Sequence, residues 1–407
     1  MTGKSLFGRI WLLCLIVFID MVGFGVIIPS LPFWTKSFGA DAFEISLVMT
    51  VFATCQFIFA FPLGWLSDRI GRKPVLALSM FGSVISFTLL GFAETLLMIF
   101  AARALGGMMG ANISVAHAYV SDVTSGRERA RAMGMLGASF GGGFVFGPAI
   151  GGAVAGADPS NPGQIAFFIG AVISAVGMIG SLIFLKEPEN QQSMAKEKSF
   201  TARLQGFSVA LSTPIMLVPI IVSGLAGLAM AGLEATYALW VHEARGWGAR
   251  QTGWFFFYIG LVLVVVQGCF IGPVNRAMGE RRMLYLGLTI ITAGMALVAV
   301  SDTLLLVFLN GTLIAMGYGF IDPAVASLIS RNSPADQQGA VMGVLQSVSS
   351  LARVIGPASA GLLFAEAGRN APYIAGAIIL AMTLAFALWR LSSLNAPTAE
   401  TVKQDVR

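Results

Sequence analysis

Apolar stretches long enough to cross a lipid bilayer recur from one end of the sequence to the other. A bilayer core about 30 Å thick needs about 20 helical residues, and lipid offers no partner for unsatisfied backbone groups, so each stretch is expected to be a helix. The stretches do not alternate in polarity as the strands of a membrane barrel do. The sequence therefore predicts an all-α integral membrane protein with twelve transmembrane helices. The predicted spans are 8–31, 43–66, 74–93, 96–121, 130–155, 164–185, 213–242, 252–273, 283–300, 303–330, 337–362 and 371–392.

The composition excludes a soluble globule. Hydrophobic residues make up 56% of the chain and charged residues 11%, whereas soluble domains carry about 25% charged residues. The net charge of +5 does not indicate nucleic-acid binding, because most Lys and Arg residues fall in loops on one side of the predicted spans. The positive-inside rule places that side, and with it both termini, in the cytoplasm.

The sequence predicts neither an enzyme nor an ATP-driven pump. It contains no phosphate-binding Gly-rich loop and no nucleophile–base constellation. Its three cysteines, Cys14, Cys55 and Cys269, lie inside apolar stretches without metal-ligand spacing. The first stretch holds Asp20 near its centre and lacks a small-residue cleavage site, so it is expected to be a retained helix rather than a signal peptide. An ion gradient is therefore the expected energy source, with no bound cofactor or metal.

Glycine and proline residues recur at matching positions in the first and second parts of the chain. Gly64 and Gly71 bracket the loop after the second span, and Gly272 and Gly279 bracket the loop after the eighth span with the same step. A Gly-Pro pair also falls late in the fifth and eleventh spans. This repeat predicts two pseudo-symmetric six-helix bundles. The expected segments are a first half over 1–185, a cytoplasmic linker over 186–212, a second half over 213–395 and a cytoplasmic tail over 396–407.

A short charged loop joins the second and third spans. Gly71 permits a tight turn, and Asp68 is placed to cap a helix or to pair with Arg72. An ordinary basic cytoplasmic loop would explain the arginines but not an acid between two glycines. Asp122, at the cytoplasmic end of the fourth span, is expected to join this loop in a gate network. The gate residues predicted on these grounds are Gly64, Asp68, Arg69, Gly71, Arg72 and Asp122.

Three motifs give the sequence a resemblance to the major facilitator superfamily. The loop from Gly64 to Lys73 resembles its signature loop, which in that family locks the cytoplasmic side. Arg103 with Gly106 and Gly110 resembles its fourth-span motif. A fifth-span motif, associated with its exporters, is matched by Gly143, Gly147, Pro148, Gly151 and Gly152; taken alone, these glycines would also suit close helix packing.

The resemblance extends to the tetracycline/proton antiporters of that superfamily. It rests on the segments 20–32, 121–131 and 272–282 and covers almost the whole chain. It implies alternating access by two helical bundles and export of a small organic substrate in exchange for protons. Those antiporters carry membrane-embedded aspartates in the third and ninth spans, where this chain has Ser86 and Ile291. The proton path and the substrate are therefore expected to differ.

Charged residues within the predicted spans are functional candidates, because a lone charge at the bilayer centre costs about 2.5–3.5 kcal/mol. We expect Asp20 to carry the coupling proton and Arg103 to modulate its charge; a static structural pair is the alternative. His117 is open to a proton-transfer role or a structural role. Asp322 and Arg353 are expected either to neutralise each other or to contact substrate.

Further polar side chains are expected to line a central cavity. They are Gln56, Asn112, Glu234 and Tyr237, together with Asp322 and Arg353. The predicted function is efflux of amphipathic organic compounds, including tetracycline-type drugs, by a monomeric multi-pass protein of the bacterial inner membrane. Two alternatives remain: a proton-coupled symporter or metabolite transporter of the same fold, and a membrane sensor or scaffold that does not transport.

Overall fold

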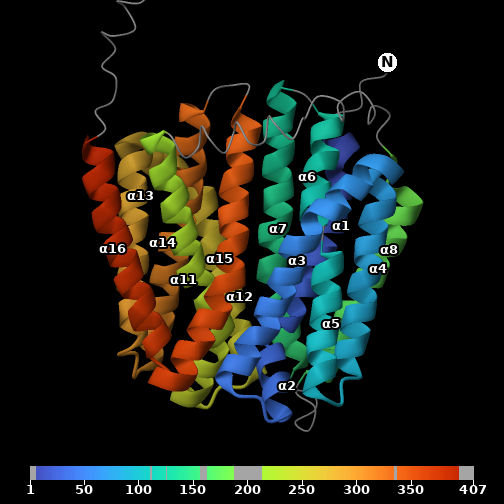
Figure 1. The fold of residues 1–407 in the computed structure, drawn as a ribbon, viewed down its shortest axis with the longest axis horizontal. Helices are drawn as coiled ribbons and strands as arrows, with labels where there is room; N and C mark the ends of the chain where they lie inside the picture. Colours follow the sequence, from blue (N-terminus) through green and yellow to red (C-terminus); the bar gives the residue numbers. More distant parts are fainter. Residues whose placement is uncertain are drawn as a thin grey trace, which may run out of the picture. The chain divides into compact units, whose positions relative to one another are not determined.

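A computed structural model describes residues 6–110, 112–124, 126–155, 163–187, 213–333 and 337–393, and within these ranges the secondary structure is helical, with no strand. Most of the predicted linker (188–212) and the predicted tail lie outside the described residues. The helices are α1 (Leu6–Ile27), α2 (Leu31–Ser37), α3 (Ala42–Ile70), α4 (Arg72–Gly91), α5 (Leu96–Met109), α6 (Asn112–Val123), α7 (Gly126–Val154), α8 (Gln164–Phe184), α11 (Pro214–Arg245), α12 (Ala249–Val265), α13 (Ile271–Val298), α14 (Leu304–Asn332), α15 (Gln338–Ala367) and α16 (Ala371–Ser393), with a π-helical turn η1 (Val266–Phe270) between α12 and α13 (Figure 1).

The described helices confirm an all-α membrane protein. Eleven helical segments are long and apolar enough to span a membrane, and one of them, Ala249–Val298, is 50 residues long. At 1.5 Å per residue that segment extends about 75 Å, more than twice the thickness of a bilayer core. Its backbone breaks at Gly279, where φ is 76° and ψ is 168°. The segment therefore accounts for two crossings, and the described helices agree with the twelve predicted spans.

Two predicted spans are interrupted. The predicted span 8–31 ends early, because α1 stops at Ile27 and α2 begins separately at Leu31, with a proline in its first turn. The predicted span 96–121 consists of two helices: α5 ends at Met109, and α6 begins at Asn112. The carbonyl oxygen of Gly110 at this break accepts a hydrogen bond of 2.9 Å from Gln56 Nε2. Such a side-chain donor lets the helix break inside the membrane without leaving that carbonyl unpaired.

Helix ends carry recognisable signals. A capping box begins α3. The backbone nitrogen of Glu44 donates to the Asp41 side chain, and the backbone nitrogen of Asp41 donates to the Glu44 side chain. Gly71 lies between α3 and α4 with a φ of 112°, a conformation that L-residues with side chains rarely adopt. Gly279, the residue placed at the equivalent position by the sequence repeat, also has a positive φ.

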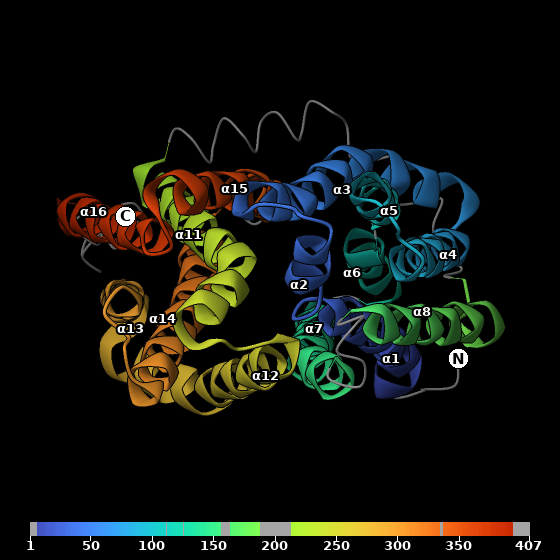
Figure 2. The same ribbon diagram turned by 90° about the horizontal axis from the view of Figure 1, so that it is seen from below.

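The chain divides into two compact units. One comprises residues 1–198, 231–264 and 353–372; the other comprises residues 199–230, 265–352 and 373–407. The first unit therefore includes one end of α11, most of α12 and one end of α15 together with α1–α8. Its helices α1, α4 and α8 lie side by side, and in the second unit α13 lies against α14 (Figure 2). These units do not have the bounds of the halves 1–185 and 213–395 that the repeat indicates, and those halves stay a prediction.

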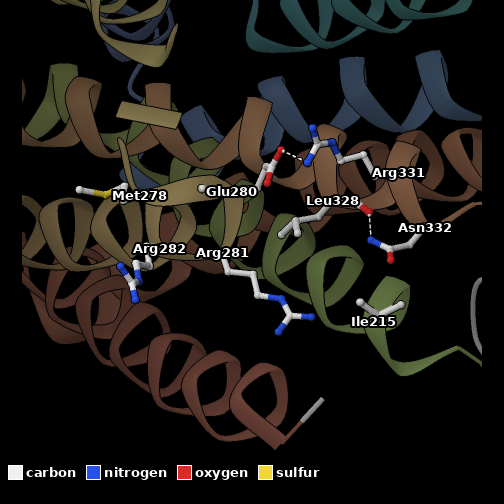
Figure 3. A pocket seen from close by; sticks show the side chains of 9 residues that line it. Ile215, Met278, Glu280, Arg281, Arg282, Leu328, Arg331 and Asn332 are labelled. Atoms are coloured by element: carbon white, nitrogen blue, oxygen red, sulfur yellow. Dashed lines mark hydrogen bonds and ion pairs between the residues drawn. The ribbon is translucent and has the colours of Figure 1, made fainter. Parts of the chain in front are cut away.

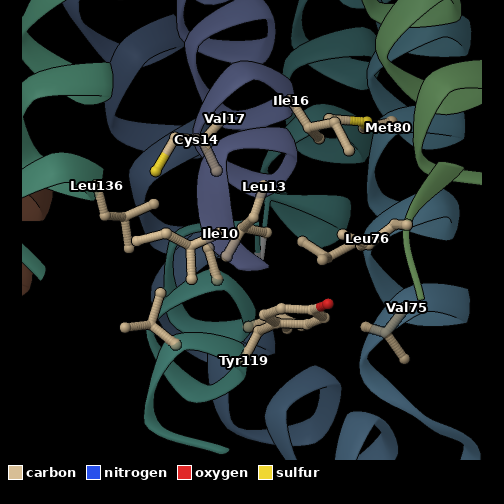
Figure 4. Packing of buried hydrophobic residues seen from close by; sticks show 14 of the residues in the cluster. Ile10, Leu13, Cys14, Ile16, Val17, Val75, Leu76, Met80, Tyr119 and Leu136 are labelled. Atoms are coloured by element: carbon tan, nitrogen blue, oxygen red, sulfur yellow. The ribbon is translucent and has the colours of Figure 1, made fainter. Parts of the chain in front are cut away.

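The core of the first unit lies between α1, α4, α6 and α7. Ile10 and Leu13 of α1 meet Leu76 of α4, Tyr119 of α6 and Leu136 of α7, all of them buried (Figure 4). The Tyr119 hydroxyl donates a 2.7 Å hydrogen bond to the backbone oxygen of Lys186, just after α8. This core holds α1 and α6 at a fixed separation, and these two helices carry the polar pair described next.

Candidate functional site

Asp20 lies on α1 and is buried, with 6% of its surface exposed. Its Oδ2 atom accepts a 2.8 Å hydrogen bond from Nδ2 of Asn112, which is also buried, in the first turn of α6. The break between α5 and α6 places Asn112 at this position. The Oδ1 atom of Asn112 has no hydrogen-bond partner. The predicted cavity residue Asn112 is therefore the direct neighbour of the predicted proton carrier.

Arg103 on α5 is buried with 2% of its surface exposed, yet its Nε and Nη1 atoms have no hydrogen-bond partner. Its guanidinium carbon lies 4.0 Å from the ring centre of Phe52 and 5.8 Å from that of Phe24. Such cation–π contacts are worth about 2 kcal/mol when desolvated, less than the several kcal/mol that burying an ion costs. The described residues contain no ion pair between Arg103 and Asp20. In this structure the two side chains are therefore not an ion pair, and the roles of Asp20 and Arg103 stay a prediction.

Ser86 and Ile291, the two positions where the sequence departs from the pattern that its resemblance implies, are fully buried. Ser86 donates a 2.7 Å hydrogen bond to the backbone oxygen of Ala102, one residue before Arg103. A Cβ atom on Gly106 would lie 2.6 Å from Ser86 Oγ. Ile291 packs against Gly317 of α14. A Cβ atom added to Gly317 would lie 2.5 Å from the backbone nitrogen of Ile291. Both positions serve helix packing here.

Two of the predicted gate residues, Asp68 and Asp122, contact a third, Arg72. Its Nη1 atom lies 2.6 Å from Asp68 Oδ1, and its Nε atom lies 2.8 Å from Asp122 Oδ2. Arg72 Nη1 also donates to Ser67 Oγ, which sequence reasoning missed. Arg69 lies over the Trp65 ring at 3.9 Å. A Cβ atom added to Gly64 would meet nothing within 4 Å. The loop thus ties α3 and α4 to the end of α6.

Glu187 also contacts this charged loop, which the sequence did not reveal. Its carboxylate accepts hydrogen bonds from the backbone nitrogens of Arg72 and Lys73, the first residues of α4. A carboxylate there satisfies free N–H groups and complements the positive end of the helix. A Cβ atom on Gly71 would lie 2.8 Å from this carboxyl group, so glycine is required there for space as well as for its φ. Glu187 lies in the predicted linker, and only its charge beside a proline marked it in the sequence.

The second unit carries an ion pair of opposite polarity at the corresponding place. Glu280 directly follows Gly279, as Arg72 follows Gly71, and its Oε1 atom lies 2.9 Å from Nη1 of Arg331 near the end of α14. Arg276 lies where the first loop has Asp68, and its side chain donates a hydrogen bond to the backbone oxygen of Gly272.

The glycines of the fifth-span motif form a contact face on α7. Cβ atoms added to Gly143, Gly147 and Gly151 would lie 2.1–2.6 Å from atoms of α1: Met21 Cβ, Gly25 Cα and the Val26 backbone oxygen. Gly152 points elsewhere, toward Gly253 of α12 in the same compact unit, where its Cβ would lie 2.8 Å from Cα. Pro148 lies inside α7 between these contacts. The motif therefore allows α7 to approach two helices at backbone distance.

The other candidates lie apart from Asp20. His117 is exposed on α6; its Nδ1 atom lies 3.3 Å from Met133 Sδ, and its ring stacks on Phe140. Glu234 is exposed although its neighbours along α11 are buried, and it has an electrostatic interaction with Arg353 of α15.

Two predictions about the cavity need correction or stay untested. Tyr237 is buried and stacks on Phe255 at 5.2 Å, so it does not line an open space in this structure. Arg353 has an electrostatic interaction with Glu234, which sequence reasoning did not predict. Asp322 is exposed on α14 and belongs to the other compact unit, so its predicted pairing with Arg353 stays a prediction.

These features define a class: a polytopic helical membrane protein with a buried acid, a buried arginine and a charged loop at the helix ends. Residues 13–274 and 266–405 match the family model of the Major Facilitator Superfamily, and the chain belongs to that family.

Curated relatives and solved structures agree with this assignment. The chain is 31% identical over 401 residues to tetracycline resistance protein, class B, of Escherichia coli, covering 96% of this chain and 97% of that protein. It is 29% identical over 356 residues to multidrug resistance protein 2 of Bacillus subtilis, covering 86% of each chain. In fold it is similar to the crystal structure of a bacterial homologue of the human lysosomal transporter Spinster, with a TM-score of 0.78, 15% identity and coverage of 98% of this chain and 100% of that one.

Proposed function

We propose that this protein exports amphipathic organic compounds in exchange for protons by alternating access. The observation that carries the proposal is the buried Asp20, which accepts a hydrogen bond from a neutral amide, near a buried Arg103 with unpartnered donors. Because no cation among the described residues forms an ion pair with Asp20, its carboxyl group can take up and release a proton. Because Arg103 has donors available, it can bind an acceptor on the substrate or on the protein in another state.

The family relatives support the substrate class. Relatives named for tetracycline resistance and for multidrug resistance align along most of the chain. Ser86 and Ile291 replace the membrane aspartates that the resemblance to tetracycline antiporters implied, and both are buried in helix contacts. Drug-like amphipathic compounds are therefore the proposed class, with tetracyclines as members to be tested.

The membrane arrangement is also proposed. The proposal places the protein in the bacterial inner membrane with both termini and the Asp68–Arg72–Asp122 network in the cytoplasm, and the positive-inside bias of the loops supports this orientation. The proposed unit is a monomer driven by the proton gradient, without a bound cofactor.

The test is proton-driven uptake into everted membrane vesicles. Vesicles holding the wild type, Asp20→Asn or the control Asp302→Asn are energised, and accumulation of ethidium and of tetracycline is followed with and without an uncoupler. Asp302 is exposed between α13 and α14 in the other compact unit, so its replacement removes the same charge at an exposed loop position. Asp20→Asn is expected to abolish accumulation, and Asp302→Asn to preserve it. Unchanged accumulation in Asp20→Asn would refute the proton-carrier role, and no accumulation of any tested compound by the wild type would refute drug export.

A further inference from the structure

A basic cavity opens in the second compact unit where α11 begins and α14 ends. Its volume is about 510 Å³ (Figure 3). Its apolar lining residues are Ile215, Met278 and Leu328. The charged and polar lining residues are Glu280, Arg281, Arg282, Arg331 and Asn332.

The cavity has an excess of positive charge. Glu280 carries the one carboxylate among the described lining residues; it is paired with Arg331 and accepts a further hydrogen bond from Ser327. Arg281 donates a 3.1 Å hydrogen bond to the backbone oxygen of Leu391 in α16, and so ties the cavity to that helix. Among the described residues that line the cavity, the three arginines Arg281, Arg282 and Arg331 outnumber the one carboxylate. The charges of Arg281 and Arg282 therefore favour an anionic ligand.

An apolar groove lies between α11 and α16. It has a volume of about 390 Å³ and is lined on α11 by Ile221 and Leu225 and on α16 by Ile379, Met382, Thr383 and Phe386. Along α11, Ile221 lies about 9 Å and Leu225 about 15 Å from Ile215 of the basic cavity. A ligand that fits both features has an anionic head and apolar chains that extend along the helices.

We infer that the basic cavity binds the headgroup of an anionic phospholipid, whose acyl chains lie in the groove between α11 and α16. The phosphodiester oxygens match the planar donors of Arg281 and Arg282. Basic pockets between membrane helices are suited to such headgroups, and each arginine near the surface adds about 1 kcal/mol, or about fivefold in affinity. A phosphatidylcholine headgroup carries a compensating cation and gains less. This site is separate from the proposed transport site and does not depend on it.

The experiment counts lipids bound to the purified full-length protein by native mass spectrometry. The protein is titrated with cardiolipin, phosphatidylglycerol and phosphatidylcholine. The wild type is expected to bind the two anionic lipids on the order of tenfold more tightly than phosphatidylcholine, and Arg281→Gln/Arg282→Gln is expected to lose that preference. Arg276→Gln is the matched control, because Arg276 is an exposed arginine on the same helix that does not line the cavity. It should keep the preference.

The remaining arms keep the inference open to refutation. If the double variant does not fold, Arg282→Gln alone changes an exposed side chain and should weaken anionic lipid binding about fivefold. Millimolar inorganic phosphate is added to the lipid complex as a competitor; displacement of cardiolipin by it would mean that the cavity takes free phosphate, against our inference. Equal binding of anionic and zwitterionic lipids, or an unaltered preference in both variants, would also overturn it. Since bound lipid is counted without transport, a failure of drug export leaves this result unchanged.

Discussion

Asn112 donates a hydrogen bond to the carboxylate of Asp20, while its own side-chain oxygen accepts none. An amide side chain offers both donors and an acceptor. When Asp20 is ionised, it accepts from Asn112 Nδ2, as in this structure. When Asp20 is protonated, its hydroxyl can donate to Asn112 Oδ1. One neutral neighbour can therefore satisfy a buried carboxyl in both protonation states, which a permanently charged partner cannot do.

Replacing Asn112 by Leu is expected to reduce proton-driven drug accumulation about fivefold or more. The change removes the partner of a buried carboxylate, which costs about 1–3 kcal/mol, and each 1.4 kcal/mol is about a factor of ten. The matched control is Asn310→Leu, which removes a buried 2.8 Å hydrogen bond to Ser301 in α13–α14. Accumulation in vesicles is normalised to the folded protein. Equal losses in the two variants would indicate a general packing effect and contradict the coupling role.

The sequence was sufficient for features that depend on neighbours along the chain. Span lengths, the positive-φ glycine at Gly71 and the meeting of Asp68 with Arg72 all follow from short-range spacing. Asp122 could be added because helix ends on one side of a membrane gather in one layer.

The sequence was insufficient where packing of distant helices decides the partner. Asn112, rather than Arg103, contacts Asp20 because α5 and α6 break near Gly110, and no apolar pattern marks that break. Glu187 was assigned to the linker because it lies in a polar segment. In the structure it comes just after α8, and its carboxylate accepts a hydrogen bond at the start of α4. The electrostatic interaction between Arg353 and Glu234 is between residues more than a hundred positions apart in the sequence, so residue spacing could not predict it.

Arg103→Met is expected to stabilise the protein and to abolish drug accumulation. Burying an ion costs several kcal/mol, and the cation–π contact with Phe52 returns about 2 kcal/mol, so an apolar side chain of similar length should raise the free energy of unfolding by about 1–4 kcal/mol. Unfolding is followed by thermal denaturation in detergent. Arg69→Met is the control, since Arg69 makes a similar contact with Trp65 at an exposed position and should show little gain. A lower melting temperature for Arg103→Met would mean that Arg103 has a permanent partner.

The two carboxylates that contact Arg72 are expected to contribute unequally. The Asp122 side chain is 9% exposed and that of Asp68 is 43% exposed. Double-mutant cycles with Arg72→Gln should therefore give a coupling energy of about 1–3 kcal/mol with Asp122→Asn and below about 1 kcal/mol with Asp68→Asn. The free energies come from unfolding in mixed micelles. High salt should reduce only the Asp68 value, and a larger coupling to Asp68 would contradict the assignment.

Two neighbouring glycines of α7 are expected to respond to alanine in opposite directions. A Cβ atom on Gly143 would lie 2.2 Å from Met21 Cβ of α1, whereas a Cβ atom on Gly141 would have nothing within 4 Å. Overpacking a close helix contact costs about 1–3 kcal/mol, and alanine in an open helical position gains up to about 1 kcal/mol over glycine. Gly143→Ala should therefore lower the melting temperature and drug accumulation, while Gly141→Ala should leave accumulation intact and raise the melting temperature slightly.

A second pair on the same helix separates a local clash from a property of the motif. Gly151→Ala would place Cβ 2.1 Å from the backbone oxygen of Val26, and backbone cannot rotate away as a side chain can; Gly137→Ala meets nothing. Gly151→Ala is therefore expected to be the most damaging of the four substitutions and Gly137→Ala to behave like Gly141→Ala. Thermal denaturation in detergent ranks them. If Gly151→Ala were as stable as Gly137→Ala, the close approach of α7 to α1 would not be maintained in the folded protein, and the fifth-span glycines would need another explanation.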